Sequence, residues 1–331
     1  MKICVYGAGV IGGVLASACE RAGHEVSVIA RGAHLEAIKA NGLTIEAPGH
    51  WVTTHPAASS HAADFGPQDL VIVTTKTPAL QDVARGIGPL LGPQTQVAFS
   101  VNGVLWFYGD GFTPGELGPG IKADCTRLDP DGLLHKTFDM ERVHGLIAWA
   151  GGEINEPGIV HASRAKGVFA LGPALKKNAG LAQRLINDLA VTESQIDFAP
   201  DLRLPMWKKY MQVAANFALC SLTTAPIGTI QSDPAVYEVM LGMMAETAAV
   251  AKAHGVEGLG FDIGKLRANP SNSVHKPSML QDLERGRVME IDSSILALQD
   301  LARGAGVPTP VLDIVAPLIA LRAKTAGLYT G

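Results

Sequence analysis

The sequence predicts a two-domain α/β protein in which an N-terminal, doubly wound parallel sheet is followed by an all-helical domain. Its 331 residues suit two domains at roughly 150 residues each. Strand and helix patterns alternate over the first hundred residues, whereas long helical patterns follow residue 201. The apolar fraction of 47% indicates a folded chain, and the aromatic fraction of 5% predicts an aliphatic core.

The N-terminal elements begin with a strand, a helix and a second strand at Lys2–Tyr6, Ile11–Arg21 and Glu25–Ala30, which together predict a βαβ unit. Apolar, β-branched runs bounded by turn residues indicate the later strands. Further strands are expected at Asp69–Thr75, Gln96–Val101, Gly145–Trp149, Gly158–His161 and Val168–Leu171, and a helix is expected over Ala79–Leu91.

A Gly-, Pro- and Asp-rich stretch interrupts this pattern at about 104–140. A structureless loop of that length is unusual inside a domain, so it is either a lid or an insertion, and we expect an insertion near the active site. The first domain then covers 1–200 and the helical domain 201–331, where long helices offer a surface for a homodimer. Its helices are expected over Arg203–Leu222, Ala235–Ala253, Met279–Arg303 and Val311–Ala323.

Composition excludes several classes of function. The net charge is −4, and scattered Lys and Arg residues do not form the basic patch that nucleic-acid binding needs. No apolar run predicts a membrane span, and no signal peptide precedes the first strand, so we expect a cytoplasmic protein. Four separated cysteines and ten histidines show no metal-binding spacing, so no metal site is expected.

A glycine-rich motif follows the first strand and opens the first helix, which is the context that dinucleotide binding requires. The first glycine permits a tight turn, the second lets backbone approach a pyrophosphate, and the third allows close helix packing. The helix N-terminus supplies N–H donors for the phosphates. The expected cofactor-binding residues of this turn are Gly7, Ala8, Gly9, Val10, Ile11 and Gly12.

Arg31, at the end of the second strand, favours NADP over NAD. An acidic residue there would bind the ribose 2′-OH, whereas an arginine pairs with a 2′-phosphate. No Asp or Glu occurs between Val26 and Ala33. The alternative is that Arg31 is a solvated loop charge.

Seven motifs in order resemble the ketopantoate reductase (2-dehydropantoate 2-reductase) family over nearly the whole chain. The resemblance is strongest where SMLQD is followed by EID. The motifs are KICVYGAGVIGG, VIVTTKT, SVNGV, INEPGIV, MWKKY, PSMLQDLERGRVMEID and GVPTP.

The resemblance implies NADPH-dependent reduction of a 2-oxo acid to a 2-hydroxy acid, with the substrate held between the two domains. It makes Lys209 the general acid and Glu290 its acidic partner, which also contacts the substrate hydroxyl. Independently, hydride transfer to a ketone builds negative charge on oxygen and requires a nearby proton donor. Lys208, the neighbouring lysine, is the other candidate for the general acid. The alternative for Glu290 is a solvated helix carboxylate that pairs with Arg287.

Three further positions carry family roles. Lys76 and Asn102 follow buried strands at the sheet edge where such folds bind ligands, and the resemblance has them contact cofactor and substrate. A capping lysine and an Asn-Gly turn are the structural alternatives for these two residues. Ser278 resembles the hydroxyl that binds the substrate carboxylate, and it could also be the N-cap of its helix.

Two departures from the family concern the substrate. Val213 and Phe217 stand where the family has asparagines, and Asn216 is one residue out of register with Phe217, a rotation of about 100°. Apolar groups there favour a bulkier, less polar 2-oxo acid. The second departure is the long insertion after Asn102, where a lid over the substrate could be built. The rings of Trp106, Phe107 and Tyr108 either line this lid or pack the loop.

Two other functions stay open. One is an NADP-dependent hydroxy-acid dehydrogenase of the same fold that acts on another substrate. The other is a non-catalytic NADPH-binding sensor, although such a sensor would have no use for a proton donor at Lys209.

Overall fold

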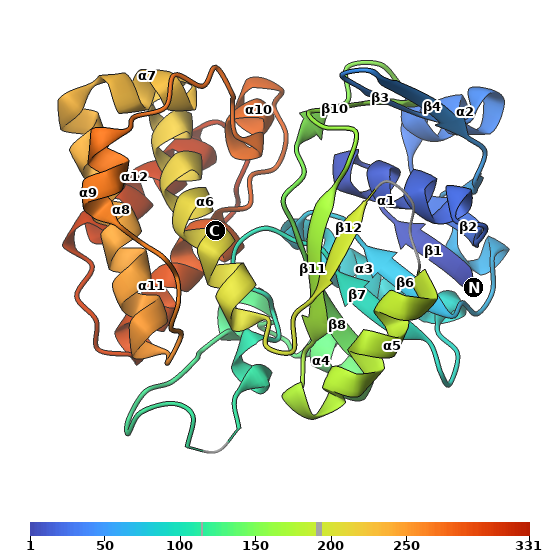
Figure 1. The fold of residues 1–331 in the computed structure, drawn as a ribbon, viewed down its shortest axis with the longest axis horizontal. Helices are drawn as coiled ribbons and strands as arrows, with labels where there is room; N and C mark the ends of the chain where they lie inside the picture. The colour runs from blue at the N-terminus through green and yellow to red at the C-terminus, as the bar shows by residue number, and fades with distance from the viewer. Residues whose placement is uncertain (114, 190–193) are drawn as a thin grey trace. The chain divides into compact units, whose positions relative to one another are not determined.

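The computed structural model describes residues 1–113, 115–189 and 194–331, and the chain forms two compact units (Figure 1). The first comprises Met1–Val101 and Asp131–Leu202, and the second comprises Asn102–Pro130 and Arg203–Gly331. The later boundary lies two residues after the expected one. The segment 102–130, expected within the first domain, packs instead with the helical unit, because its backbone and side chains bond to helices there.

An eight-stranded sheet forms the centre of the first unit. Its spatial order is β12-β11-β8-β7-β6-β1-β2-β5. Numbered among themselves, the six parallel strands have the doubly wound order 3-2-1-4-5-6. The strands are β1 (Lys2–Tyr6), β2 (Glu25–Ile29), β5 (Ala57–Ser59), β6 (Leu70–Val73), β7 (Gln96–Phe99), β8 (Val143–Ala148), β11 (Val168–Pro173) and β12 (Gln195–Phe198).

Two strands depart from the expected parallel arrangement. β11 pairs antiparallel with β8, and β12 is parallel to β11. The connection 149–167 contains no helix, and without such a crossover the chain returns antiparallel.

Helix α1 (Val10–Arg21) packs against both this sheet and a smaller one. A Cβ on Gly12 would lie 2.0 Å from Gly7 O, and a Cβ on Gly13 would lie 2.8 Å from Val160 Cγ2. The two adjacent glycines therefore permit close approach in different directions. The smaller sheet, which was not expected from the sequence, has the order β4 (His50–Thr54), β3 (Leu43–Ala47), β10 (Ile159–Ala162) and β9 (Gly152–Glu153).

The other helices of the first unit are short. The helix expected over Ala79–Leu91 ends at Gly86, and a 3-10 turn follows at Gly88–Leu90, where Pro89 has no N–H to continue an α-helix. These helices are α2 (Gly32–Asn41), α3 (Leu80–Gly86), α4 (Leu133–Thr137) and α5 (Ala179–Leu189).

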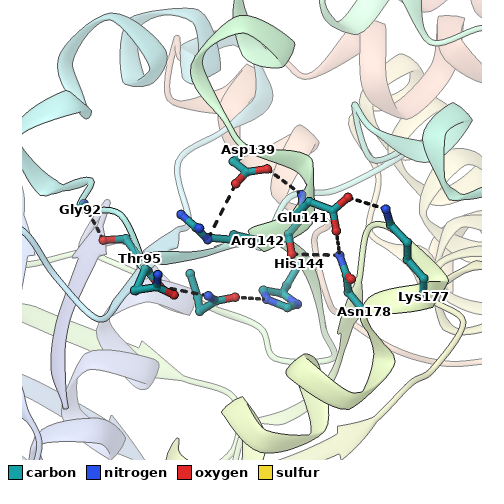
Figure 2. A network of polar contacts seen from close by, with 10 residues as sticks. Gly92, Thr95, Asp139, Glu141, Arg142, His144, Lys177 and Asn178 are labelled. Atoms are coloured by element: carbon teal, nitrogen blue, oxygen red, sulfur yellow. Dashed lines mark hydrogen bonds and ion pairs between the residues drawn. The ribbon is translucent and has the colours of Figure 1, made fainter.

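Polar contacts fix the segment before β8 to the start of α5 (Figure 2). Asn178 Nδ2 donates to Glu141 Oε2 at 3.0 Å, and Lys177 Nζ lies 2.5 Å from Glu141 Oε1. His144 on β8 is fully buried, and its Nε2 lies 2.9 Å from Gln96 Oε1. Burial lowers the pKa of His144 to about 4, so the ring is neutral at pH 7.

The second unit is built around the long helix α6, which packs against α8, α10 and α12. Asp233 caps α8 by accepting from the backbone N–H groups of Ala235 and Val236. The side chain of Glu246 accepts from two N–H groups in the first turn of α12. The helices are α6 (Arg203–Thr223), α7 (Ile227–Ser232), α8 (Pro234–Ala253), α9 (Ile263–Ala268), α10 (Ser278–Glu284), α11 (Ala297–Gly304) and α12 (Pro310–Thr325).

The single helix expected over Met279–Arg303 is wrong. α10 ends at Glu284, Gly286 adopts a φ of +62° and the chain stays non-helical as far as Glu290. A glycine in the left-handed region is a common helix terminator. A π-helix at Asp292–Leu296 then leads into α11. In the described parts of the chain, no helix is long and apolar enough to cross a bilayer.

Candidate active site

The glycine turn between β1 and α1 has the geometry that its motif predicts. Gly7 has a φ of +112°, and its N–H donates to Ile29 O at 3.0 Å. A side chain on Gly12 would collide with the turn, whereas a Cβ on Gly9 would meet nothing within 4 Å. The turn is therefore closely packed at Gly12 and open at Gly9. The open space at Gly9 fits the approach of a pyrophosphate to the N-terminus of α1.

Arg31 and Lys76 lie at the same edge of the sheet as this turn. Arg31 is exposed directly after β2, and it precedes the first turn of α2. Lys76 follows β6, the neighbour of β1, and it is the N-cap residue of a 3-10 turn at Thr77–Ala79. Strand order reverses between β1 and β6, the position where doubly wound sheets bind ligands.

His34 was not expected from the sequence, yet it braces the glycine turn. Its Nδ1 accepts from the backbone N–H of Gly158 at 2.9 Å. Nε2 therefore carries the hydrogen and donates to Ala8 O at 2.7 Å. Burial lowers the pKa of His34, which favours this neutral form. A lone histidine on a helix gives no signal of such contacts.

Three of the predicted site residues form one hydrogen-bonded set in the second unit. Lys209 Nζ donates to Asn102 Oδ1 at 2.9 Å, and Asn102 Nδ2 donates to Glu290 Oε2 at 3.3 Å. Only one orientation of the amide satisfies both neighbours, because its oxygen must face the ammonium and its NH₂ the carboxylate. Asn102 thus connects two opposite charges from α6 and from the segment before the π-helix.

Burial has the largest effect on the acidity of Lys209. It lowers the pKa of the ammonium to about 8, although the charge of Glu290 acts to raise it. The Glu290 residue is only 3% exposed, so its carboxylate needs polar partners such as the Asn102 amide. Burial therefore outweighs the nearby carboxylate in setting the pKa of Lys209.

The Asn102-Gly103 turn sits tightly against the π-helix. Gly103 has a φ of +81°, and a Cβ there would lie 2.1 Å from Ser293 O. The next residue, Val104, donates its N–H to the same carbonyl at 2.9 Å. The turn and the functional interpretation of Asn102 therefore coexist, since the turn places the amide beside Glu290.

Ser278 is the first residue of α10 and is partly exposed. Pro277 occupies the N-cap position, so the alternative role of Ser278 as N-cap is not observed. Within the described residues, no hydrogen bond joins Ser278 to Lys209, Asn102 or Glu290. Its contact with a substrate carboxylate stays a prediction.

The substituted positions on α6 differ in burial. Phe217 is buried in the helical unit, whereas Val213 and Asn216 are partly exposed. Seven residues make nearly two helical turns, so Asn216 points within about 20° of the direction of Lys209. Asn216 is out of register with Phe217, but it lies on the Lys209 face of the helix.

The three aromatic residues after Asn102 are packed inside the second unit. Trp106, Phe107 and Tyr108 are all buried, and Tyr108 OH accepts from Trp207 Nε1 at 3.0 Å. The Tyr108 ring also lies edge-on to Trp207. Of the two interpretations of this cluster, the structure supports packing.

Comparisons with known proteins agree with this architecture. The family model Ketopantoate reductase PanE/ApbA matches residues 3–105, and the model of its C terminal matches 201–323. A 2-dehydropantoate 2-reductase of Mesorhizobium japonicum is 34% identical over 334 residues, covering 100% of both chains.

Solved structures share the fold. The 2-dehydropantoate 2-reductase of Geobacter metallireducens GS-15 has a TM-score of 0.82 and 25% identity, covering 97% of this chain and 100% of that one. A D-mandelate dehydrogenase with NADH and anilino(oxo)acetate has a TM-score of 0.81 and 20% identity, covering 99% and 100%. The chain thus belongs to the ketopantoate reductase family of nicotinamide-dependent reductases, and it is an oxidoreductase acting on CH–OH groups.

Proposed function

We propose that the protein reduces a 2-oxo acid to the 2-hydroxy acid with NADPH, and that Lys209 is the general acid. When bound, NADPH would supply the hydride for the new C–H bond, and the carbonyl electron pair would move to oxygen. Lys209 Nζ gives that oxygen a proton and becomes neutral, to be reprotonated from solvent. The observation that carries the proposal is the hydrogen-bonded set of Lys209, Asn102 and Glu290.

The acidity of Lys209 suits this step. A lysine with a pKa near 8 is largely protonated at pH 7, and it gives up its proton more readily than an ordinary lysine with a pKa near 10.4. Asn102 holds the ammonium by its amide oxygen, which leaves two of the three N–H donors to turn toward a substrate. Glu290 provides the compensating charge and, by the family resemblance, contacts the substrate hydroxyl.

The cofactor is assigned as NADPH on the strength of Arg31. Gly7, Ala8, Gly9, Val10, Ile11 and Gly12 would hold the pyrophosphate at the open turn. By the family resemblance, Lys76 and Asn102 would also contact the cofactor. The exposed guanidinium of Arg31 at the end of β2 can pair with a 2′-phosphate. The D-mandelate dehydrogenase of the same fold was solved with NADH. The experiment must therefore compare NADPH with NADH.

The substrate is a 2-oxo acid with an apolar side chain larger than that of ketopantoate. Val213 is the partly exposed one of the two substituted positions and cannot donate a hydrogen bond, so polar recognition on this face of α6 falls to Lys209 and Asn216. Ser278 would bind the carboxylate. This apolar replacement also favours the second candidate, a hydroxy-acid dehydrogenase of the same fold with another substrate.

Spectrophotometry of NADPH oxidation tests the function directly. Purified protein is assayed with ketopantoate, aliphatic 2-oxo acids of increasing size and benzoylformate, and the reverse reaction is assayed with the matching hydroxy acids and NADP. We expect turnover to increase from ketopantoate to the larger apolar acids. Turnover of ketopantoate alone would contradict the substrate assignment, and NADPH binding without any turnover would indicate the sensor.

The outer face of α12 is proposed to form a homodimer. Ile314, Leu318 and Leu321 are 66%, 50% and 59% exposed and follow helical spacing along this face. Asp313 and Lys324 flank the face near opposite ends of α12. An antiparallel second copy would pair each Asp313 with the partner's Lys324, and it would bury the apolar face against itself.

Light scattering during size exclusion tests this dimer. Leu318→Asp should yield monomers, while Val274→Asp, which changes a single apolar side chain that is 88% exposed, should leave the dimer intact. A weak dimer has a dissociation constant of about 10 µM. Wild-type protein that stays monomeric at about 100 µM would therefore overturn the proposal.

A further inference from the structure

The segment that carries Glu290 is held from outside by the C-terminal tail. Residues 285–288 before it are exposed and non-helical, whereas Met289 and Glu290 are buried. Met289 donates its N–H to Leu328 O at 3.0 Å. Leu328 in turn donates its N–H to Ala323 O at 2.9 Å, which anchors the tail on the last turn of α12.

The tail also holds the residue on the far side of Glu290. Tyr329 OH donates to Asp292 Oδ1 at 2.7 Å, at the first residue of the π-helix. Glu290 thus lies between two positions that are each bonded to adjacent residues of the tail. Such paired contacts restrict a short segment more than either one alone, because each limits rotation about the other.

Arg127, from the segment 102–130, reinforces the same point. Its NH1 lies 3.6 Å from Asp292 Oδ1, and its Nε donates to Asp300 Oδ2 at 2.5 Å. The guanidinium also donates from NH2 to Asp300 Oδ1 at 3.3 Å, so it is held by both carboxylate oxygens. Asp292 therefore has a donor from Tyr329 and a neighbouring cation from Arg127.

We propose that the Leu328–Tyr329 tail is a clamp that positions Glu290 against Asn102 and Lys209, with Tyr329 acting through Asp292. This rests on the proposed function of Lys209 and Glu290. Tyr329 touches neither reactant and is a positioning residue. When the clamp is weakened, the Glu290 carboxylate moves away from Asn102 more often, and the Asn102 amide no longer has a fixed orientation toward Lys209.

The matched pair of variants is Tyr329→Phe and Tyr237→Phe. Both remove one tyrosine hydroxyl in the same unit, but Tyr237 OH donates to Leu266 O at 2.6 Å, between α8 and α9. We expect Tyr329→Phe to lower kcat by about 10-fold, the effect of one charge-assisted hydrogen bond, with the KM for NADPH unchanged. Tyr237→Phe should leave both parameters unchanged.

The pH profile separates positioning from general loss of structure. Glu290 raises the pKa of Lys209, so a more distant carboxylate lets that pKa fall. Activity falls as the pH rises and Lys209 loses its proton. In Tyr329→Phe this fall should begin at a lower pH than in the wild type. Asp292→Asn keeps an acceptor for Tyr329 but loses its charge, and it should produce a smaller change in the same direction.

The pKa of Lys209 can be measured without turnover, so the clamp can be tested separately from the proposed reaction. The Lys209 Nζ resonance is titrated by NMR in ¹³C,¹⁵N-lysine-labelled protein and assigned by its loss in Lys209→Met. A lower Lys209 pKa in Tyr329→Phe than in Tyr237→Phe supports the clamp even if no 2-oxo acid is reduced. An unchanged pKa in folded Tyr329→Phe overturns the clamp, even if the wild type is an active reductase.

Discussion

The candidate cofactor site in the first unit is made mainly of backbone, whereas the proposed catalytic site in the second is made of side chains. The glycine turn requires residues without a side chain, since a Cβ at Gly12 would overlap Gly7 O. At Lys209, the proposed function depends on side chains: Asn102 accepts from the ammonium, and Glu290 accepts from the Asn102 amide. The first kind of site is local in sequence, while the second joins residues 102, 209 and 290.

Substitutions should therefore impair the two sites in different ways. A backbone site fails by steric overlap, and where the protein already fills the space, as at Gly12, the overlap removes binding together with folding. A side-chain site fails chemically, because the helix that carries Lys209 remains packed when its ammonium is removed.

The largest expected effect is on kcat in Lys209→Met. Loss of a general acid should lower kcat by about 10²- to 10⁴-fold, while NADPH affinity and thermal stability stay close to wild type. Steady-state kinetics and cofactor titration measure both. The control is Lys208→Met, whose side chain is exposed and which should keep full activity. Equal loss of activity in the two variants would remove Lys209 from its proposed role.

Next in size is the steric effect of Gly12→Ala. The added Cβ must displace Gly7 O and Thr74 Oγ1, and overpacking of this kind costs about 3 kcal/mol of unfolding free energy. Gly9→Ala adds the same methyl group to open space, so it should fold as the wild type while binding NADPH more weakly. Urea denaturation and cofactor titration compare them, and equal unfolding free energies would contradict the packing role.

A comparable effect is expected from acid at His144. Its folded pKa of about 4 lies below the unfolded value near 6.5, so the unfolded state binds more protons between these values. The contribution of His144 to the free energy of unfolding is therefore fully present above pH 6.5. It falls as the pH drops, by up to about 3 kcal/mol at pH 4.

Urea denaturation at several pH values in wild type and His144→Gln isolates this contribution. The variant should lose less stability between pH 7 and 4, because glutamine does not titrate. His254, buried in the second unit with a lowered pKa, gives a matched comparison in His254→Gln. Identical pH slopes for wild type and His144→Gln would contradict the prediction.

The smallest expected effect concerns cofactor choice at Arg31. Loss of one exposed pairing with the 2′-phosphate should reduce the preference for NADPH over NADH by about 10-fold, or about 1.4 kcal/mol. Arg85→Ala on α3 removes another exposed arginine, which is paired with Asp82, and should leave the preference unchanged. The ratio of kcat/KM values for the two cofactors decides it, and an unchanged ratio in Arg31→Ala would favour the solvated loop charge.

Periodic segments and contiguous motifs were predictable. The helices at Arg203–Thr223 and Pro234–Ala253 agree closely with the expected ranges, and so do the first strands and the glycine turn. The small sheet was not predicted, although β3 and β4 have five residues each, as β1 and β2 do, because the sequence does not show that β3 pairs with the distant strand β10. The helix across Gly286 was wrongly extended because its apolar spacing continues through a turn that only the backbone reveals.

The α/β class, the dinucleotide turn and the family follow from the amino-acid sequence alone, because they depend on local patterns and on motifs in the family's order along one chain. Tertiary structure decided that residues 102–130 pack with the helical unit. It also decided that Asn102 lies between Lys209 and Glu290, and that burial lowers the pKa of Lys209 to about 8. Hydrogen bonds between distant residues and the loss of solvent around a charge depend on the folded chain, and no local pattern encodes them.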